Sequence, residues 1–402
     1  MRGRARTGAE TQWLRRGQRL ALARMAPRSS DPAEQAARLA RGAEDCLPEG
    51  ALEEKLRLAA REERPLRAKL GIDPTAPDIH LGHVVVLDRL RAFQDAGHVV
   101  VLIVGDYTAR VGDPSGRSAT RPVLSGEEID RNAATFQDQA FKVLDPDPER
   151  VEVRRNGEWL DMAAEDLFRL ARTTTVAQLL ERDDFARRYG RGDPISVLEL
   201  LYPLMQGYDS VAVRADVELG GTDQKFNLLL ARDIQRAYGQ PEQVALTLPI
   251  LPGTDGERRM SKTLDNYVGI TEPPEEMYGK TLRVPDSALD IWYRLLTGAP
   301  PPDGVPARDA KRALARSLVA RFHDPGAAER AEAHFDRVFV DREAPDEVEE
   351  ATFDAGNGGV HVPAVLEELF GMSRSEGRRL LAQGGVRLDG EALGADDQDL
   401  PV

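Results

Sequence analysis

Two short segments of this sequence combine residue types that suit the binding of a polyphosphate. The first is His80-Leu81-Gly82-His83, which follows a Pro-rich turn and opens an apolar run of helical character. Positions i and i+3 of a helix face the same way, so we expect both imidazoles at the first turn, where unpaired backbone N–H groups attract anions. Gly82 has no side chain, and a flat base or a ribose could therefore approach the backbone. A zinc pair and two ordinary surface histidines are the alternatives. Because no Cys or His cluster elsewhere supplies further zinc ligands, we predict no metal site.

The second segment is the polar loop Arg259-Met260-Ser261-Lys262-Thr263, far downstream of the histidines. A cation on such a loop can close over a triphosphate, and Lys262 would then stabilise the charge of a departing pyrophosphate. An exposed basic turn is the alternative. The loop follows a predicted buried strand, so it should lie on the same edge of a sheet as the histidines. The two segments together predict a binding site for a nucleoside triphosphate, which they would contact from two sides.

Two further loops at predicted strand ends combine glycines with polar side chains. They are Gly112-Asp113-Pro114-Ser115-Gly116 and Gly220-Gly221-Thr222-Asp223-Gln224. Glycine lets a backbone approach a ligand closely. Asp113 could hold an ammonium group, while Asp223 and Gln224 could hold ribose hydroxyls or an amino acid. Either loop alone could be a plain turn, but two on one sheet edge favour a binding site.

A polar stripe lies on one predicted helix. Tyr202, Gln206 and Asp209 occupy positions i, i+4 and i+7, which share a helix face. The stripe could be simple packing, with Asp209 near a helix end. It could also form a polar pocket in an apolar wall that binds both an amino group and a phenol.

The elements that must position these residues predict a parallel α/β sheet. Leu66–Ile72 and His98–Gly105 are near-continuous apolar strands on either side of a predicted helix, Val84–Ala96. This pattern indicates a βαβ unit with a right-handed crossover. Ligands of such sheets bind at the carboxyl ends of the strands, where the histidine segment and the glycine loops fall. Further along, we expect a helix over 197–208, a strand over 217–219, a helix over 223–238 and a strand over 244–251.

Composition limits the class of protein. The chain has 402 residues, is 41% hydrophobic and carries a net charge of −14, which predicts two or three domains and argues against a general nucleic-acid coat. An RNA substrate on a local basic face remains compatible with this charge. The single cysteine, Cys46, excludes an internal disulfide framework and suits a reducing compartment. No apolar run is long enough for a membrane span, and we expect a cytoplasmic protein.

Taken together, these motifs resemble the tyrosyl-tRNA synthetases of bacterial type, a class I family. The resemblance extends from about residue 35 to residue 402. The stretch from Pro74 to His83 resembles the HIGH signature of the class, and Arg259 to Thr263 resembles its KMSKS signature. The Gly-Gly-Thr-Asp-Gln loop and an Asn-x-x-Trp pair, Asn156 and Trp159, also match family motifs.

The resemblance implies a role for each matching residue. It implies catalytic roles for His80, His83, Arg259 and Lys262. It implies ATP binding by Gly82, Gly221, Asp223, Gln224 and Lys262. It implies L-tyrosine binding by Asp73, Asp113, Asn156, Tyr202, Gln206 and Asp209, with the carboxylate of Asp209 accepting the phenol. It implies tRNA binding by Arg374, Arg378, Arg379 and Arg387, which we expect to share one face.

The resemblance also implies the reaction and its partners. ATP, as its Mg²⁺ complex, would activate L-tyrosine to tyrosyl-adenylate with release of pyrophosphate, and the tyrosyl group would then pass to tRNA(Tyr). We expect a homodimer and no tightly bound cofactor. Two alternatives are a tryptophanyl-tRNA synthetase, which shares the catalytic fold, and a non-catalytic RNA-binding protein derived from a synthetase.

The expected fold is α/β, with a Rossmann-like parallel-sheet catalytic domain, then an α-helical domain and a small α+β S4-like RNA-binding domain. We expect an Arg-rich, disordered extension over residues 1–35, which could be a transit peptide or could follow from a true start at Met25. The predicted catalytic domain covers 36–284 with a helical insertion at about 125–196. A helical anticodon-side domain follows over 285–350, and a linker with a truncated S4-like unit over 351–402. In that unit, Ser373 and Glu376 have capping-box spacing and Asp389-Gly390 predicts a hairpin turn.

The chain departs from the family pattern at three places. Lys69 stands where many relatives have a tyrosine that shares the phenol, as in a second bacterial branch, so phenol recognition should depend more on Asp209. Arg259 replaces the usual first lysine of the KMSKS loop and changes the geometry of its charge. The sequence ends at Val402, before the last strand and basic tail expected of an S4-like domain.

Overall fold

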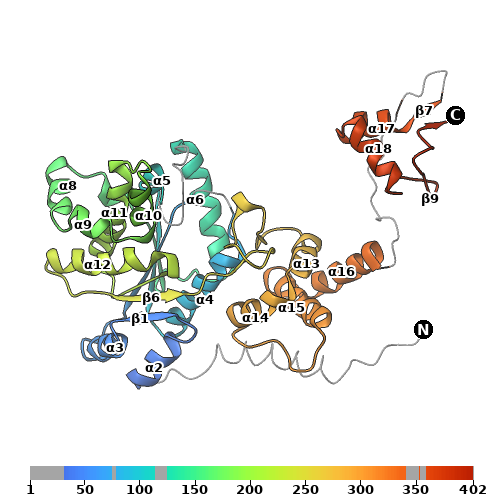
Figure 1. The fold of residues 1–402 in the computed structure, drawn as a ribbon. Helices are drawn as coiled ribbons and strands as arrows, with labels where there is room; N and C mark the ends of the chain where they lie inside the picture. The colour runs from blue at the N-terminus through green and yellow to red at the C-terminus, as the bar shows by residue number, and fades with distance from the viewer. Residues whose placement is uncertain (1–30, 75–77, 114–124, 341–352, 354–358, 402) are drawn as a thin grey trace. The chain divides into compact units, whose positions relative to one another are not determined.

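The computed structural model describes residues 31–74, 78–113, 125–340, 353 and 359–401 (Figure 1). The chain divides into two compact units, residues 1–335 and residues 336–402, which are described separately. Most of the predicted N-terminal extension and of the predicted linker lies outside the described residues. The same holds for residues 75–77 of the HIGH-like stretch and 114–116 of the Asp113 loop.

The larger unit is built on a six-stranded sheet with the order β1-β6-β5-β2-β3-β4. The strands are β1 (Asp45–Leu47), β2 (Arg67–Ile72), β3 (Val99–Val104), β4 (Val151–Arg155), β5 (Val217–Gly221) and β6 (Val244–Leu248). Every neighbouring pair is parallel except β1 with β6, which is antiparallel. The order grows outward from β2 in one direction and from β5 in the other, so a topological switch point lies between these two strands. Ligands of open α/β sheets bind at such a point, beyond the carboxyl ends of the strands.

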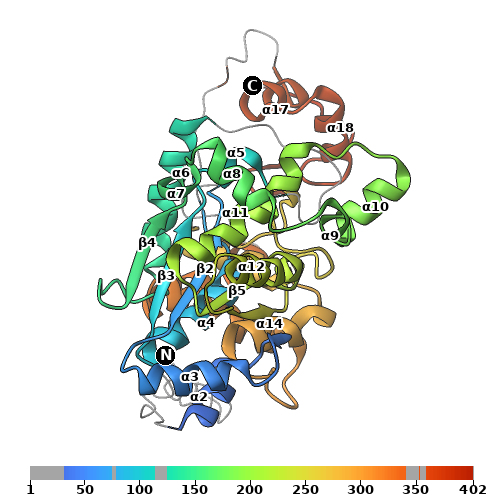
Figure 2. The same cartoon turned by 90° about the vertical axis from the view of Figure 1, so that its left-hand side faces the viewer.

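Helices cover both faces of the sheet, as Figures 1 and 2 show. The helices of this unit are α2 (Pro32–Leu39), α3 (Ala51–Arg61), α4 (Leu81–Asp95), α5 (Thr108–Val111), α6 (Gly126–Ala140), α7 (Gly157–Leu160), α8 (Ala164–Ala171), α9 (Val176–Leu179), α10 (Asp183–Arg191), α11 (Val197–Val213), α12 (Lys225–Ala237), α13 (Pro274–Leu282), α14 (Leu289–Thr297), α15 (Ala307–Phe322) and α16 (Pro325–Phe335). Helices α4 and α6 lie on one face, and α11 and α12 lie on the other. The predicted βαβ unit is confirmed as β2-α4-β3, and its alternate strand residues pack toward different helical layers.

Helix α11 carries the polar stripe and begins where the sequence caps it. The backbone N–H of Glu199 donates to Ser196 Oγ at 3.1 Å, and the backbone N–H of Ser196 donates to Glu199 Oε2 at 2.9 Å. This reciprocal pair satisfies two N–H groups that a helix start leaves unpaired. The helix therefore starts at a defined residue, which sets where Tyr202, Gln206 and Asp209 meet the sheet.

Two strands of the larger unit were missed by the sequence analysis. β4 lies within the segment 125–196, where we expected helices, and it pairs in parallel with β3. Its sequence, Val-Glu-Val-Arg-Arg, alternates like an edge strand and lacks the apolar run that marks a central one. β1 is short and lies at the opposite edge. Helices α13–α16 share one continuous cluster of buried side chains with α4 and the sheet, and the proposed domain boundary near residue 285 stays a prediction.

The smaller unit contains two helices and short strands. They are α17 (Val362–Phe370), α18 (Arg374–Ala382), β7 (Val360–His361), β8 (Arg387–Leu388), β9 (Glu391–Ala392) and β10 (Asp399–Leu400). The predicted capping box is confirmed, because the backbone N–H of Glu376 donates to Ser373 Oγ and that of Ser373 to Glu376 Oε2. Asp389 and Gly390, with φ of 51° and 89°, form the predicted hairpin turn between β8 and β9. β10 pairs with β7, so a C-terminal strand is present in this unit. Within the described part of the chain, helices that combine the length and apolar character of a membrane span are absent.

Candidate active site

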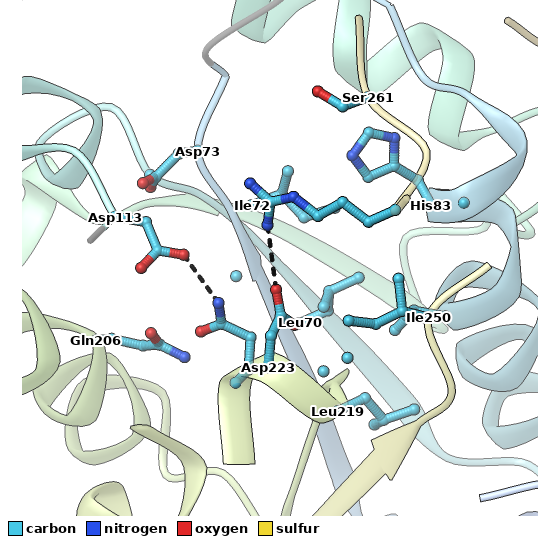
Figure 3. Close-up of a pocket in the computed structure, with 18 of the residues that line it drawn as sticks. Leu70, Ile72, Asp73, His83, Asp113, Gln206, Leu219, Asp223, Ile250 and Ser261 are labelled. Atoms are coloured by element: carbon cyan, nitrogen blue, oxygen red, sulfur yellow. Dashed lines mark hydrogen bonds and ion pairs between the residues drawn. The ribbon is translucent and has the colours of Figure 1, made fainter. Parts of the chain in front are cut away.

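A cavity of about 370 Å³ opens at the carboxyl ends of β2, β3 and β5, at the topological switch point. Its lining includes residues of the histidine segment, of the lysine loop and of the polar stripe on α11. Figure 3 shows His83 and Ser261 on one side of this space and Asp73, Asp113 and Gln206 on the other. Motifs that are far apart in the sequence therefore share one cavity, as the two-sided grip requires.

The two histidines stack at the start of α4. Their ring centroids are 3.9 Å apart with an interplanar angle of 27°. His80 is the residue before the helix and not part of its first turn, which corrects the expected placement. Its backbone N–H donates to Nδ1 of His83 at 3.2 Å, so the neutral ring of His83 carries its proton on Nε2 and can donate from there.

Burial makes both imidazoles neutral near pH 7. It lowers the pKa of His83 to about 4 and the pKa of His80 well below its ordinary value. The nearby His83, Lys262 and Arg259 lower the pKa of His80 further. The pair can therefore stabilise phosphate oxygens by donating N–H groups, while positive charge has to come from other residues.

The lysine loop is held close to the histidines by main-chain hydrogen bonds just beyond it. The N–H of Leu81 donates to the Val268 oxygen at 2.9 Å, and the N–H of Ile270 donates to the Ile79 oxygen at 3.0 Å. Met260 of the loop is buried and lies 3.6 Å from where a Cβ on Gly82 would be. The loop and the histidine segment thus lie on the same edge of the sheet.

The cations of the loop face carboxylates on the cavity rim. Lys262 forms an ion pair with Asp78, and its ammonium group lies 5.5 Å from the ring centroid of Tyr267. Arg259 Nη1 lies 3.4 Å from Asp223 Oδ2, a contact drawn in Figure 3. These side chains are partly exposed, so an anion of higher charge can replace the carboxylates.

A second group of hydrogen bonds surrounds Asp73 at the end of β2. Tyr202 Oη donates to Asp73 Oδ2 at 2.8 Å, and Thr108 Oγ1 donates to Asp73 Oδ1 at 2.6 Å. Burial, and then the negative charge of Asp73, raise the pKa of the Tyr202 phenol well above its ordinary value. A Cβ on Gly105 would lie only 2.1 Å from Asp73 Oδ1, so only glycine fits beside this carboxylate. The arrangement fixes Asp73 where it can face a cationic group in the cavity.

The glycine loops meet across the same space. Gln224 Nε2 donates to Asp113 Oδ2 at 2.8 Å, and the Arg182 guanidinium lies 3.6 Å from Asp113 Oδ1. A Cβ on Gly221 would lie 2.7 Å from Asp223 Oδ1, so a side chain at this position would displace the Asp223 carboxylate. The predicted proximity of these loops is confirmed for the residues that the structure describes.

Asp209 is a buried carboxylate with two side-chain donors. Trp159 Nε1 donates to Asp209 Oδ1 at 2.8 Å, and Asn156 Nδ2 lies 3.5 Å from Oδ2. Burial raises the pKa of Asp209 to about 7, against the lowering effect of the Lys69 charge and of the Trp159 hydrogen bond. A Cβ at Gly71 would lie 4.0 Å from Asp209 Oδ2, so the absence of a side chain there leaves room in front of this carboxylate.

Two ion pairs around the cavity were missed by sequence reasoning. Lys69 and Glu218 form a buried ion pair of 3.0 Å, and Asp78 pairs with Lys262. A signal for the first pair was available, because a charged residue inside an apolar strand has to find a partner. Asp78 offered no such signal, since one more aspartate in a polar turn is unremarkable by its type.

The arginines that we expect to bind tRNA belong to the smaller unit. Arg374, Arg378, Arg379 and Arg387 are all exposed. Arg374 Nε lies 2.6 Å from Glu367 Oε2, and Arg387 Nη1 donates to the Gly390 oxygen at 3.3 Å. Their expected common face stays a prediction.

Comparison with known proteins shows the family. Residues 61–340 match the sequence model described as tRNA synthetases class I (W and Y). The chain belongs to this family. It is 49% identical over 377 residues to the tyrosine–tRNA ligase of Moorella thermoacetica, a match that covers 90% of each chain. It is 48% identical over 374 residues to the tyrosine–tRNA ligase of Thermotoga maritima, which covers 90% of this chain and 91% of the relative.

The fold of this class I synthetase also matches solved structures. The tyrosyl-tRNA synthetase of Archaeoglobus fulgidus, solved with L-tyrosine, superposes with a TM-score of 0.60 at 25% sequence identity. That match covers 75% of this chain and 100% of the other. Membership of the class implies ATP as a substrate, and in this synthetase the stacked histidines and the lysine loop flank one side of the cavity (Figure 3).

Proposed function

We propose that this synthetase is a tyrosine–tRNA ligase that works in two steps. The tyrosine carboxylate attacks the α-phosphorus of ATP, which forms the carboxyl–phosphorus bond of tyrosyl-adenylate as the bond to pyrophosphate breaks. A terminal ribose hydroxyl of tRNA(Tyr) then takes the tyrosyl group and releases AMP. The observation that carries this proposal is one cavity in which a buried acceptor for a phenol and a polyphosphate grip face the same space. The names of the relatives support tyrosine over tryptophan.

The proposed tyrosine subsite consists of the acidic and amide side chains on one side of the cavity. Asp209 accepts the phenol hydroxyl, held in place by Trp159 and Asn156. The α-amino group, which is cationic near neutral pH, is received by the acceptors Asp73, Asp113, Tyr202 and Gln206. When phenylalanine binds, the buried carboxylate of Asp209 would be left without a hydroxyl partner. The tyrosine subsite therefore discriminates between tyrosine and phenylalanine.

The proposed ATP subsite lies at the other side, where charge develops as the reaction proceeds. Gly82, Gly221, Asp223 and Gln224 receive the adenosine part. His80 and His83 donate neutral N–H groups to the phosphate oxygens, while Arg259 and Lys262 supply positive charge. The substrate carboxylate is already ionised, so the first step needs no general base. Catalysis then depends on positioning and charge stabilisation, with ATP entering as its Mg²⁺ complex.

Lys262 has to exchange partners for this mechanism. It forms an ion pair with Asp78. The polyphosphate carries more negative charge than one carboxylate, so it draws the ammonium group away from Asp78 and closes the loop over the leaving pyrophosphate. We further propose that the exposed arginines of the smaller unit contact tRNA, and that the protein acts as a cytoplasmic homodimer.

The test is ATP–pyrophosphate exchange with purified protein. We expect exchange that depends on L-tyrosine, with far weaker exchange for L-phenylalanine and L-tryptophan, followed by charging of tRNA(Tyr). Exchange that depends on tryptophan would support the tryptophanyl alternative. Tight tRNA binding without any exchange would support the non-catalytic one and refute the proposal.

A further inference from the structure

A buried lysine at the base of the cavity has all of its donors occupied within the protein. Lys69 Nζ lies 3.0 Å from Glu218 Oε1, and it donates to Ser210 Oγ at 2.7 Å and to the main-chain oxygen of Gln206 at 3.1 Å. An ammonium group has three N–H donors, so these acceptors use all of them. The exposed fractions of the two charged side chains are 0% and 1%. Lys69 therefore has no donor left for a substrate.

The ion pair forms the layer directly beneath the cavity. Lys69 and Glu218 are register partners on β2 and β5, the two strands at the switch point. Side chains alternate along a strand, so Gly71 and Gly220 lie on the same sheet face two residues nearer to the strand ends. Gly71 leaves space for a ligand, because a Cβ there would have only Asp209 Oδ2 nearby, at 4.0 Å. Gly71, Gly220 and Glu218 all contribute to the lining of that space.

The pair also forms hydrogen bonds to one turn of α11. Glu218 Oε1 accepts a hydrogen bond from Gln206 Nε2 at 3.2 Å, and Glu218 Oε2 accepts one from Ser210 Oγ at 3.1 Å. Together with the bonds from Lys69, these contacts hold the main chain and the side chain of Gln206 and the side chain of Ser210. Asp209 lies between them on the same turn. The position of the phenol acceptor over the sheet thus depends on two charges that lie behind it.

We propose that Lys69 and Glu218 are a positioning pair for amino-acid selection, which holds α11 in the register that presents Gln206 and Asp209 to the substrate. The inference rests on the proposed function, because it concerns selection of tyrosine at that site. Lys69 does not line the cavity, and its donors are all used within the protein. The lysine therefore acts through the helix and not as a direct partner of the phenol.

Lys69 and Glu218 also affect the phenol acceptor electrostatically, because their charges change the pKa of Asp209. The groups that face it are Lys69 from β2, Glu218 from β5 and Tyr202 from its own helix, with Asp73 beyond Tyr202. Burial raises the pKa of Asp209, the charge of Lys69 lowers it and the charge of Glu218 raises it. Removing the ammonium group should therefore raise the pKa of Asp209 further.

The experiment measures tyrosine- and phenylalanine-dependent pyrophosphate exchange in the full-length protein across pH. For Lys69→Met we expect KM for tyrosine to rise about tenfold with kcat within about threefold, because charged hydrogen bonds that orient the site are lost. The preference for tyrosine over phenylalanine should fall by about the same tenfold factor. The acid limb of kcat/KM for tyrosine should move to higher pH, a change that loss of packing alone would not produce.

Arg188→Met is the matched control. Arg188 of α10 forms a buried ion pair with Glu199 of α11, at 2.6 Å. Its removal also deletes the cation of a buried ion pair that contacts α11, but this pair lies outside the cavity lining. We expect the control to lose stability and to keep both the wild-type preference and the wild-type acid limb.

The double variant Lys69→Met/Glu218→Gln protects the test against misfolding, because it leaves no charge buried without a partner. It should fold, as judged by circular dichroism, and still show the reduced preference. A folded single or double variant with the wild-type preference and acid limb would overturn the inference and reduce the pair to a structural ion pair. Absence of tyrosine-dependent exchange in the wild-type protein would instead refute the proposed function.

Discussion

Replacement of Asp209 by asparagine should stabilise the protein at alkaline pH while it damages tyrosine selection. Burial raises the pKa of this carboxyl from 3.8 to about 7. The folded protein therefore holds a proton that the unfolded chain releases, and the stability from this group is complete below pH 4 and lost as pH rises to 7. At about 1.4 kcal/mol per pH unit, the ionised carboxylate costs about 4 kcal/mol above pH 7.

Asparagine cannot ionise, so the variant avoids this cost. The hydrogen bond from Trp159 can still reach the amide oxygen, while the amide nitrogen faces the donor group of Asn156. That mismatch adds a cost that does not depend on pH, and the informative quantity is the change between two pH values. We therefore compare the unfolding free energy of Asp209→Asn with that of the wild type at each pH. This difference should shift in favour of the variant by about 2–3 kcal/mol between pH 5 and pH 8.

Urea denaturation of the ligand-free protein, followed by tryptophan fluorescence, measures this difference. The described tryptophans, Trp159 and Trp292, both lie in the larger unit, so the signal reports on the unit that contains the cavity. Asp161→Asn is the control, since Asp161 is exposed and close to Trp159. A stability difference that stays constant from pH 5 to pH 8 would refute the argument that burial of the Asp209 charge governs this site. In parallel, exchange assays should show a higher KM for tyrosine and a reduced preference over phenylalanine.

Three other features of the structure can be tested in the same way. Lys262→Ala should slow tyrosine-dependent ATP–pyrophosphate exchange by about 10²–10³-fold through loss of charge stabilisation. Tyrosine binding, measured by calorimetry, should be retained. An unchanged exchange rate would contradict the role assigned to Lys262. Gly105→Ala places a Cβ against Asp73. Steady-state kinetics should show KM for tyrosine raised about tenfold, because a charged hydrogen bond is lost. A wild-type KM would show that Asp73 does not need this geometry. Ser373→Ala removes the cap of α18 and should destabilise that helix by about 1 kcal/mol, seen as faster amide exchange there with adenylate formation unaffected; unchanged amide exchange in α18 would contradict it.

Much of the catalytic layout could be predicted from the sequence because the signals are local. The apolar runs around Val84–Ala96 predicted β2, α4 and β3, and the glycine loops marked strand ends where backbone and ligand come close. The capping boxes and the Asp389-Gly390 turn were also predictable, since they depend on residues three or fewer positions apart. The edge strand β4 was missed because its alternating polar residues resemble a charged surface segment more than a central parallel strand.

The amino-acid sequence establishes which chemical groups are available: two imidazoles at a helix start, a cationic loop, and carboxylates at strand ends. Their residue types and spacings follow from local rules of helix and turn formation. Their protonation states and their partners depend on how the chain packs in three dimensions. The neutrality of the histidines, the pairing of Lys262 with Asp78 and the burial of Lys69 against Glu218 depend on which segments lie next to each other and on how much water they exclude. Burial and Coulomb energies depend on distance in space, and separation along the chain does not reveal that distance.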